Sequence, residues 1–434
     1  MSAPGPAGAG AAGHRDFTVT SLYALTFLTL ISTLNYFDRS VLSLVLPLIK
    51  KDMGLSDTAL GDISSLVAVY ALVGVPVASL ADRWSRRNVV AIGFAFWSAM
   101  TILTGFASNA LHLAGTRLLM AVGESCGVAP SNSMLSDMFT KARLPLALAV
   151  FTCASSIAAI VYSPAAGWIA DHYGWRPVFY LSGAIGLCLA PIFFFTVGEP
   201  RRGATSGDAA SVAEERPAFG LAMKFLIGSR TFVLMVLGGA FMGAYLYGTG
   251  AWGTTFLVRV HHLSLTEIGA VFGPVRGVVG AVGIILGGLI ANWLSRRDER
   301  WRGWIPGLAC LILAAFEAVF LFADPTWLWV SGLVGSSLFG IMSQPAVYAA
   351  LMAVAKPRMR ALSVSMNLLF ATVAGQLLGP SLIGRLNDAL APRFGDMAIR
   401  YSMSVVILCS VLGGLCFFAA GWFVERDMRR AAQA

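Results

Sequence analysis

Ionisable residues inside long apolar segments are the residues of this sequence that could do chemistry. The segment "ISTLNYFDRSVLSLVLP" places Asp38 next to Arg39, and a second apolar segment holds Arg117 and Glu124. An unpaired charge in apolar surroundings costs several kcal/mol. These residues are therefore expected to pair with one another, to bind a charged ligand or to bind a proton.

A helix would place Arg117 and Glu124, which are seven residues apart, on one face and about 10 Å apart along its axis. If this helix and the helix that holds Asp38 line one cavity, Asp38 would lie at the height of Arg117 and would pair with it, with Glu124 deeper in the same cavity. Arginine holds a nearby acid ionised, and the acid takes up a proton more readily once the arginine binds an anion instead. The pattern predicts proton binding at Asp38 or Glu124, coupled to anion binding at Arg117. The alternative is a static ion pair that joins two helices.

The remaining charges in apolar segments have weaker assignments. Arg39 is about 100° around a helix from Asp38, so the two cannot both face one cavity. We expect Arg39 to face a neighbouring helix or to extend outward, with direct substrate contact as the alternative. Arg276 could bind a phosphate through two parallel hydrogen bonds. Asp62 is expected at a solvated rim, and Glu317 has no evident partner.

The composition identifies the surroundings of these charges as a membrane. The chain has 434 residues, of which 57% are hydrophobic and 12% are charged, whereas soluble domains average about 25% charged residues. Its apolar stretches reach the length of about 20 residues that crosses a bilayer as a helix. We predict twelve such helices, at about 20–48, 57–81, 88–108, 111–134, 144–170, 176–197, 226–256, 264–294, 303–323, 326–352, 360–386 and 400–424.

Basic residues are distributed unevenly between the two sides that this topology defines. They concentrate in the loops after the even-numbered spans, for example Arg83, Arg86 and Arg87, and are sparse in the alternate loops. This positive-inside pattern predicts that both termini are cytoplasmic. The net charge of +9 therefore reflects topology, and we predict no nucleic-acid partner. The six cysteines show no Cys-x-x-Cys spacing and are predicted to be reduced thiols.

The sequence divides into two halves that repeat one another. The segment "ASLADRWSRR" at 78–87 matches "GLIANWLSRR" at 288–297, and a weaker match pairs Ser163, Pro164 and Asp171 with Gly379, Pro380 and Asp388. Such repeats are typical of transporters whose halves rock about a central cavity. We predict an all-α membrane protein with two pseudo-symmetric six-helix bundles. Its expected parts are a disordered tail (1–16), the first bundle (17–198), a cytoplasmic linker (199–225), the second bundle (226–425) and a cytoplasmic tail (426–434).

The repeated segment resembles a known family. "ASLADRWSRR" is similar to the loop motif of the major facilitator superfamily, with Ala78 and Ser85 where glycines are usual. "NYFDR" at 35–39, "GESCGVAPSNSMLSDMF" at 123–139 and "YGWRPVFYLSG" from Tyr173 resemble the spinster branch. That branch contains sphingolipid and lysophospholipid transporters and has bacterial relatives. Organic-anion symporters of the same superfamily carry a similar Asn-Tyr-x-Asp-Arg.

The resemblance implies a conformational latch and a substrate site. In the superfamily, the acid at the position of Asp82 interacts with the start of span eleven and helps to lock the outward-facing state. The implied latch is made of Asp82, Arg83, Arg86 and Arg87, and Asn292 predicts a weaker latch in the second half. Residues implied at the substrate site are Asn35, Tyr36, Arg39, Arg117 and Arg276.

The second half offers aromatic residues in place of acids. Its first span contains Tyr245, Tyr247 and Trp252, which we expect to form an apolar cavity wall, with ordinary helix packing as the alternative. A polar half that faces an aromatic half would suit an amphipathic substrate.

The predicted function is proton-coupled, alternating-access transport of a lysophospholipid or sphingoid phosphate across the cell (inner) membrane. The expected partners are the lipid substrate, protons and membrane lipids, and we expect a monomer without cofactors or metals. The first alternative is a proton-coupled organic-anion symporter on the same fold, and the second is an uncoupled lipid scramblase or channel. An enzyme is not expected, because the sequence shows no activated nucleophile and the pair His261 and His262 has no further metal ligands nearby.

Overall fold

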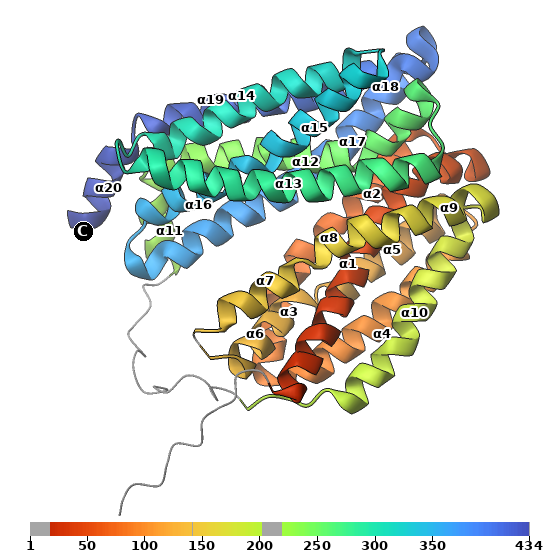
Figure 1. Cartoon of the computed structure of the whole chain (residues 1–434), viewed down its shortest axis with the longest axis horizontal. Coiled ribbons are helices and arrows are strands. Elements are labelled where there is room, and N and C mark those ends of the chain that lie inside the picture. Colours follow the sequence, from red (N-terminus) through yellow and green to blue (C-terminus); the bar gives the residue numbers. More distant parts are fainter. Residues whose placement is uncertain (1–17, 141, 202–218, 434) are drawn as a thin grey trace, which may run out of the picture.

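The computed structural model describes residues 18–140, 142–201 and 219–433, and all regular elements within these ranges are helices arranged in two bundles (Figure 1). The predicted tail 1–16 and most of the predicted linker lie outside the described residues. The all-helical prediction is confirmed for the part of the chain that the structure describes.

The first bundle contains the helices up to residue 196. They are α1 (Val19–Met53), α2 (Asp57–Ser65), α3 (Val69–Arg83), α4 (Arg86–Gly105), α5 (Ala110–Glu124), α6 (Val128–Met138), α7 (Leu144–Thr152), α8 (Ala154–Ile157), α9 (Ser163–Tyr173) and α10 (Trp175–Thr196). A 3₁₀ turn at Leu66–Ala68 joins α2 to α3, and a π-helical turn at Ala158–Tyr162 joins α8 to α9.

The second bundle contains the helices from residue 219 onward. They are α11 (Phe219–Ile227), α12 (Arg230–His261), α13 (Leu265–Ser295), α14 (Trp301–Phe322), α15 (Thr326–Met342), α16 (Gln344–Ala353), α17 (Arg360–Phe394), α18 (Ala398–Ser402), α19 (Ser404–Gly421) and α20 (Val424–Gln433). Short 3₁₀ turns precede α17 and α18. Helix α11 begins inside the predicted linker, and α20 occupies the predicted cytoplasmic tail.

Ten segments of the described chain are helical, long and apolar enough to cross a bilayer, whereas the sequence predicts twelve. The predicted span at 111–134 is not among the ten, because residues 125–127 form a turn between α5 and α6. The last two predicted spans fall in one continuous segment, Pro357–Gly421, of 65 residues.

Local sequence signals explain where many helices begin and end. Serine, threonine or asparagine precedes several first turns and accepts a hydrogen bond from a backbone N–H that the helix leaves free. Asn109, for example, accepts from the backbone of His112 at 2.8 Å. Gly54 ends α1 in the left-handed conformation (φ 63°), which glycine adopts without strain.

The last helix, α20, is attached to the second bundle through a buried acid. Asp427 is 3% exposed. Its Oδ2 accepts hydrogen bonds from the hydroxyl of Ser229 at 2.8 Å and the backbone N–H of Thr231 at 2.9 Å, at the first turn of α12. The segment predicted as a tail is therefore folded onto the bundle.

The two bundles meet at one end of the molecule. There α2 packs against α17 and α9 packs against α13, while α1 and α12 pack against each other near the middle. Figure 1 shows the bundles close together near α2 and α9 and farther apart near α6, α7, α11 and α16. Large apolar side chains such as Phe195, Ile285 and Leu289 lie on the outside, as expected for surfaces that face lipid.

Candidate functional site

Two adjoining cavities lie between the bundles. Their volumes are about 260 Å³ and about 380 Å³, and Tyr36, Ser40, Ser43 and Gly250 line both. The smaller cavity extends between α9 and α13 and reaches Arg276. The larger cavity extends toward α2 and α17 and is lined by Arg39 and Arg117 among others. A ligand in this space would contact both bundles.

Arg39, which is partly exposed, and the buried Glu124 form an ion pair at the larger cavity. The Nε of Arg39 lies 3.0 Å from Oε2 of Glu124, and the Glu124 side chain is 0% exposed. The Tyr70 ring lies under the guanidinium, with its centroid 3.7 Å from Cζ. Within the described residues, Nη2 of Arg39 and Oε1 of Glu124 have no hydrogen-bond partner. The pair therefore retains free polar atoms beside the cavity.

The expectation that Asp38 faces the cavity is wrong, whereas Arg39 contacts neighbouring helices, as expected, and also lines the cavity. Arg39 lines the cavity, whereas the Asp38 carboxylate accepts hydrogen bonds from Ser182 at 2.6 Å and Thr101 at 3.3 Å. Ser182 is on α10 and Thr101 is on α4, so Asp38 points into the first bundle. One residue corresponds to about 100° around a helix, and the packing of α1 turns Arg39 rather than Asp38 toward the cavity.

The predicted ion pair between Arg117 and the Asp38 carboxylate is also wrong. Nη2 of Arg117 donates to the backbone carbonyl oxygen of Asp38 at 2.9 Å. Nη1 lies 3.1 Å from the sulfur of Met120. The side chain lines the larger cavity, and Nε has no partner among the described residues. Arg117 therefore holds the backbone of α1 next to the Arg39–Glu124 pair.

Of the other predicted substrate residues in the first bundle, one lines the cavities and one is buried in the bundle. Tyr36 lines both cavities, as expected for a contact residue. Asn35 is 2% exposed, and its Nδ2 has no partner among the described residues. Ser40 and Ser43 follow on the cavity side of α1 and were not predicted. The two serines are three residues apart, which places them on one face of the helix. This spacing, next to Arg39, was the signal in the sequence that could have identified them.

The second bundle places one arginine and one aromatic residue of the predicted set at the cavities. Arg276 lines the smaller cavity, with Cζ 4.6 Å from the Phe272 ring centroid, and two of its nitrogen atoms have no partner among the described residues. Tyr247 lines the larger cavity. Tyr245 and Trp252 are buried in the bundle core, so the expected three-residue aromatic wall is reduced to Tyr247.

The buried partners of Tyr245 and Trp252 explain their positions. The hydroxyl of Tyr245 donates to Oε2 of Glu317 at 3.4 Å, and Nε1 of Trp252 donates to the carbonyl oxygen of Pro380 at 2.9 Å. Glu317 is 0% exposed. Its partner Tyr245 is 72 positions away in the chain, so no local pattern indicates the pairing.

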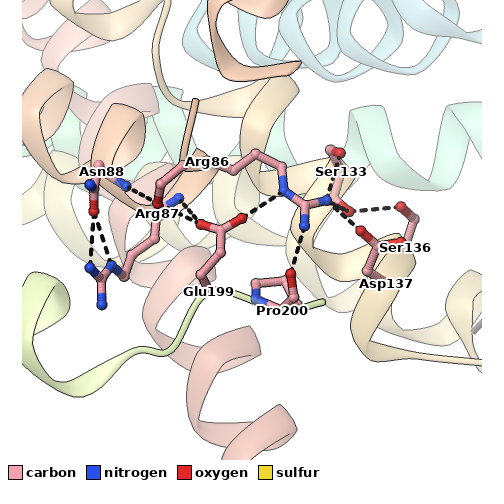
Figure 2. A network of polar contacts seen from close by, with 9 residues as sticks. Arg86, Arg87, Asn88, Ser133, Ser136, Asp137, Glu199 and Pro200 are labelled. Atoms are coloured by element: carbon pink, nitrogen blue, oxygen red, sulfur yellow. Dashed lines mark hydrogen bonds and ion pairs between the residues drawn. The ribbon is translucent and has the colours of Figure 1, made fainter. Parts of the chain in front are cut away.

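Arg86, predicted as part of the latch, is the centre of a polar network within the first bundle (Figure 2). Its guanidinium is buried and donates to Glu199 and to the carbonyl oxygens of Ser133 and Pro200. It also forms an ion pair with Asp137. The network joins α4 to α6 and to the segment after α10, so these contacts stay inside one bundle.

The other predicted latch residues are less connected. Arg83 is exposed, and the Arg87 guanidinium donates to the side chain of its neighbour Asn88. The backbone N–H of Arg87 donates to Glu199 at 2.8 Å. The side chain of Asp82 lies outside the described part of the structure.

Comparison with known proteins decides the family. A model of the Major Facilitator Superfamily matches residues 28–380. This chain belongs to the Major Facilitator Superfamily. An MFS-type efflux pump of Mycolicibacterium smegmatis is 32% identical to it over 94% of this chain and 95% of that protein. A sphingosine-1-phosphate transporter of Danio rerio is 25% identical over 95% of this chain and 86% of that protein.

Two further comparisons refine the superfamily assignment. A bacterial homologue of the human lysosomal transporter spinster, crystallised in an inward-facing, unoccupied conformation, has a TM-score of 0.83 and 25% identity, with 96% of this chain and 99% of that one covered. A protein described as a probable galactarate/D-glucarate transporter of Bacillus subtilis is 25% identical over 71% of this chain and 73% of that protein.

These likenesses confirm the spinster resemblance and the major facilitator fold. The chain is a multi-pass membrane protein, and its family and fold are those of transporters rather than enzymes. The cavities between the bundles occupy the place where the superfamily binds substrates between its two halves.

Proposed function

We propose that this chain moves an amphipathic lipid with an anionic headgroup, such as a lysophospholipid or a sphingoid phosphate, by proton-coupled alternating access. The observation that carries the proposal is the Arg39–Glu124 pair at a cavity between the bundles. The similarity to spinster proteins and to a sphingosine-1-phosphate transporter supports the choice of lipid.

The proposed topology has twelve spans, with both termini in the cytoplasm of the cell (inner) membrane. The turn between α5 and α6 would lie within span four, and α17 and α19 would form the last two spans. The distribution of basic residues supports this orientation. In this frame the end at which α2 and α13 begin faces outward, and the latch residues Asp82, Arg83, Arg86 and Arg87 lie at the cytoplasmic end. The segment 199–225 would link the two bundles on that side.

The proposed coupling follows from charge balance. Arg39, Arg117, Asp38 and Glu124 together carry no net formal charge when all four are ionised. A monoanionic headgroup would add one negative charge to this apolar region, which is costly. One proton on Glu124 would restore neutrality, so anion and proton favour each other's binding.

Glu124 is the better placed of the two candidate acids. Its partner Arg39 lines the cavity, and Nη2 of that arginine has no hydrogen-bond partner among the described residues. An anion there would compete with Glu124 for the guanidinium, and the released carboxylate would accept a proton. The Asp38 carboxylate accepts hydrogen bonds from Ser182 and Thr101 inside the first bundle, so we assign Asp38 the supporting role of fixing α1.

The mixed lining of the cavities supports an amphipathic substrate. Hydroxyl groups and arginines lie beside apolar side chains, among them Leu42, Val67 and Leu246 in the larger cavity. In the smaller cavity Arg276 lies against Phe272. A headgroup would bind the arginines while the acyl chain occupies the apolar surface.

A small organic anion is the second candidate substrate. Arg276 of the second bundle lines the smaller cavity, and Arg39 and Arg117 of the first bundle line the adjoining larger one, so a dianion that spans both cavities could bridge the two bundles. The similarity to the probable galactarate/D-glucarate transporter supports this alternative.

Transport in proteoliposomes tests the proposal. We expect uptake of a labelled lysophospholipid that increases with an imposed pH gradient and is competed by a sphingoid phosphate. Uptake of galactarate without lipid transport would select the organic-anion symporter. Lipid flux that ignores the pH gradient would select the uncoupled scramblase.

A further inference from the structure

Helices α2 and α13, one from each bundle, begin with similar short sequences. Residues 55–61 read Leu-Ser-Asp-Thr-Ala-Leu-Gly, and residues 263–269 read Leu-Ser-Leu-Thr-Glu-Ile-Gly. In both, the serine hydroxyl caps the helix. Ser56 accepts from the backbone N–H of Ala59 at 3.1 Å, and Ser264 accepts from that of Glu267 at 3.2 Å. The two starts are equivalent positions of the internal repeat.

Each of these helix starts binds an aspartate from the opposite bundle. Asp388 on α17 accepts from the backbone N–H groups of Asp57 at 3.1 Å and Thr58 at 2.7 Å. Asp171 on α9 accepts from the backbone N–H groups of Leu265 at 3.1 Å and Thr266 at 2.7 Å. Both carboxylate oxygens of each acid are used in the same way. A carboxylate at a helix start satisfies free N–H groups and interacts favourably with the helix dipole.

The acids also lie in equivalent sequences. Asp171 follows Gly167 by four residues, and Asp388 follows Gly384 by four residues. Both glycines allow close approach, because a Cβ on Gly167 would overlap the carbonyl oxygen of Leu265 and one on Gly384 would overlap that of Asp57. Glycines on α2 and α13 allow the same close approach from the other side. A Cβ on Gly61 would overlap the carbonyl oxygen of Pro380, and one on Gly269 would overlap that of Ser163.

We propose that these two contacts form a paired lock that holds the α2 and α13 end of the transporter closed. The paired lock consists of Asp171 with the first turn of α13 and Asp388 with the first turn of α2. Each contact joins one bundle to the other, so the bundles cannot separate at this end without breaking both. Separation would leave backbone N–H groups uncapped on both helices. This inference does not depend on the substrate or on proton coupling.

The two contacts differ in the additional ion pairs and hydrogen bonds that surround them. At the α2 contact, Asp57 forms a two-bond pair with Arg259 of α12, at 2.7 and 2.8 Å, and binds Lys50 at 2.6 Å. The equivalent residue at the α13 contact is Leu265, which carries no charge. There the hydroxyl of Thr266 donates a further bond to Asp171 at 2.6 Å. We therefore expect the α2 contact to tolerate the loss of its acid better than the α13 contact.

Distance measurements between spin labels test the paired lock. Labels at the exposed positions Lys51 and Asp396 report on the closed end, and labels at Leu146 and Met352 report on the opposite end. We expect Asp171→Ala and Asp388→Ala each to lower the ratio of closed to open molecules about threefold to tenfold. The double variant should lower it by about the product of the two. Distances should lengthen at the closed end and shorten at the opposite end.

Asp62→Asn is the matched control. Asp62 on α2 pairs with Arg385 on α17 at 3.5 Å, so this pair joins the same two helices as the Asp388 contact. Both side chains are exposed, Asp62 at 47% and Arg385 at 65%. Exposed pairs contribute little, so this variant should leave the distances unchanged. The melting temperature of each purified variant in detergent shows whether it is folded.

The glycines give a second test that changes no charge. Gly167→Ala and Gly384→Ala should open the closed end by steric overlap, whereas Gly115→Ala, where a Cβ meets nothing within 4 Å, should not. A folded double variant Asp171→Ala/Asp388→Ala with the distances of the parent protein would overturn the paired lock. So would an Asp62→Asn variant that opens as far as the double variant.

Discussion

The Nε of Arg39 lies 3.0 Å from Oε2 of Glu124, and this pair borders the cavity between the two bundles. The guanidinium is held between the carboxylate and the face of Tyr70. Nη2 of Arg39 is buried and has no hydrogen-bond partner among the described residues. Arg39 thus links the cavity to an acid that has no contact with solvent.

Glu124→Gln tests the role of this acid. Glutamine keeps the shape of the side chain but cannot exchange a proton, so a pH gradient should no longer drive accumulation. One charge moved through 100 mV supplies about 2.3 kcal/mol, and the accumulation ratio should fall toward one. Gradient-independent exchange should persist in the same proteoliposomes. Full gradient-driven uptake by this variant would remove Glu124 from the coupling mechanism.

Asp38→Asn should act mainly on stability. The carboxylate is 2% exposed and accepts from Ser182 and Thr101, and hydrogen bonds to a charged group contribute about 1.5 to 3 kcal/mol each. We expect a lower melting temperature in detergent and retained dependence of transport on the pH gradient. Ser182→Ala is the control, because it removes one of the same bonds and leaves the acid in place. Loss of gradient dependence in Asp38→Asn, without loss in Ser182→Ala, would show that Asp38 titrates during transport.

Arg276→Gln tests whether the second bundle binds the headgroup. Loss of a charge-assisted hydrogen bond costs about 1.5 to 3 kcal/mol, so the Kd for a phosphorylated lipid should rise about tenfold or more. Binding of the matching lipid without a phosphate should change much less. Arg385→Gln, which removes an arginine that is 65% exposed at the rim, is the control. Equal loss for both lipids would indicate a packing role for Arg276.

Glu199 should make the stability of the first bundle depend on pH. Partial burial raises the pKa of its carboxyl, but hydrogen bonds from the Arg87 backbone, Ser85 and Arg86 outweigh burial and hold the pKa below its ordinary value. The stabilisation is therefore complete above the ordinary glutamate pKa of about 4.3 and is lost as the pH falls through the lower, folded-state value.

The melting temperature of Glu199→Gln in detergent tests the predicted direction in which stability changes with pH. At neutral pH the variant should melt below the parent protein, and the difference should shrink as the pH is lowered past the glutamate range. Asp298→Asn, at an acid on a loop of the second bundle, is the control. A difference that grows with acidification would contradict the assignment.

The sequence predicted the membrane fold well because composition and apolar length report it directly. The repeat at 78–87 and 288–297 predicted two related halves. The more informative repeat at 55–61 and 263–269 was missed, because its shared serine, threonine and glycine resemble ordinary helix starts. Only the contacts with Asp388 and Asp171 show why these positions recur.

The site could be predicted less completely. Spacing shows that Asp38 and Arg39 point in different directions, but it does not show which of them faces the cavity. That choice depends on how α1 packs against α4 and α10, which no local pattern records. For the same reason the sequence predicts a pair between Arg117 and the Asp38 carboxylate, whereas Arg117 donates to the backbone carbonyl oxygen of Asp38. Partners distant in the sequence, such as Tyr245 and Glu317, leave no signal in a single sequence.

The capping of α12 by Asp427 has a consequence for how the chain is made. Ser229 and Asp427 are 198 residues apart, so the first turn of α12 is completed by a residue that leaves the ribosome 198 residues later. Until then that turn has uncapped N–H groups. Helix α12 can therefore reach its final form only after Asp427 has left the ribosome, and truncation before Asp427 would leave its first turn without this cap.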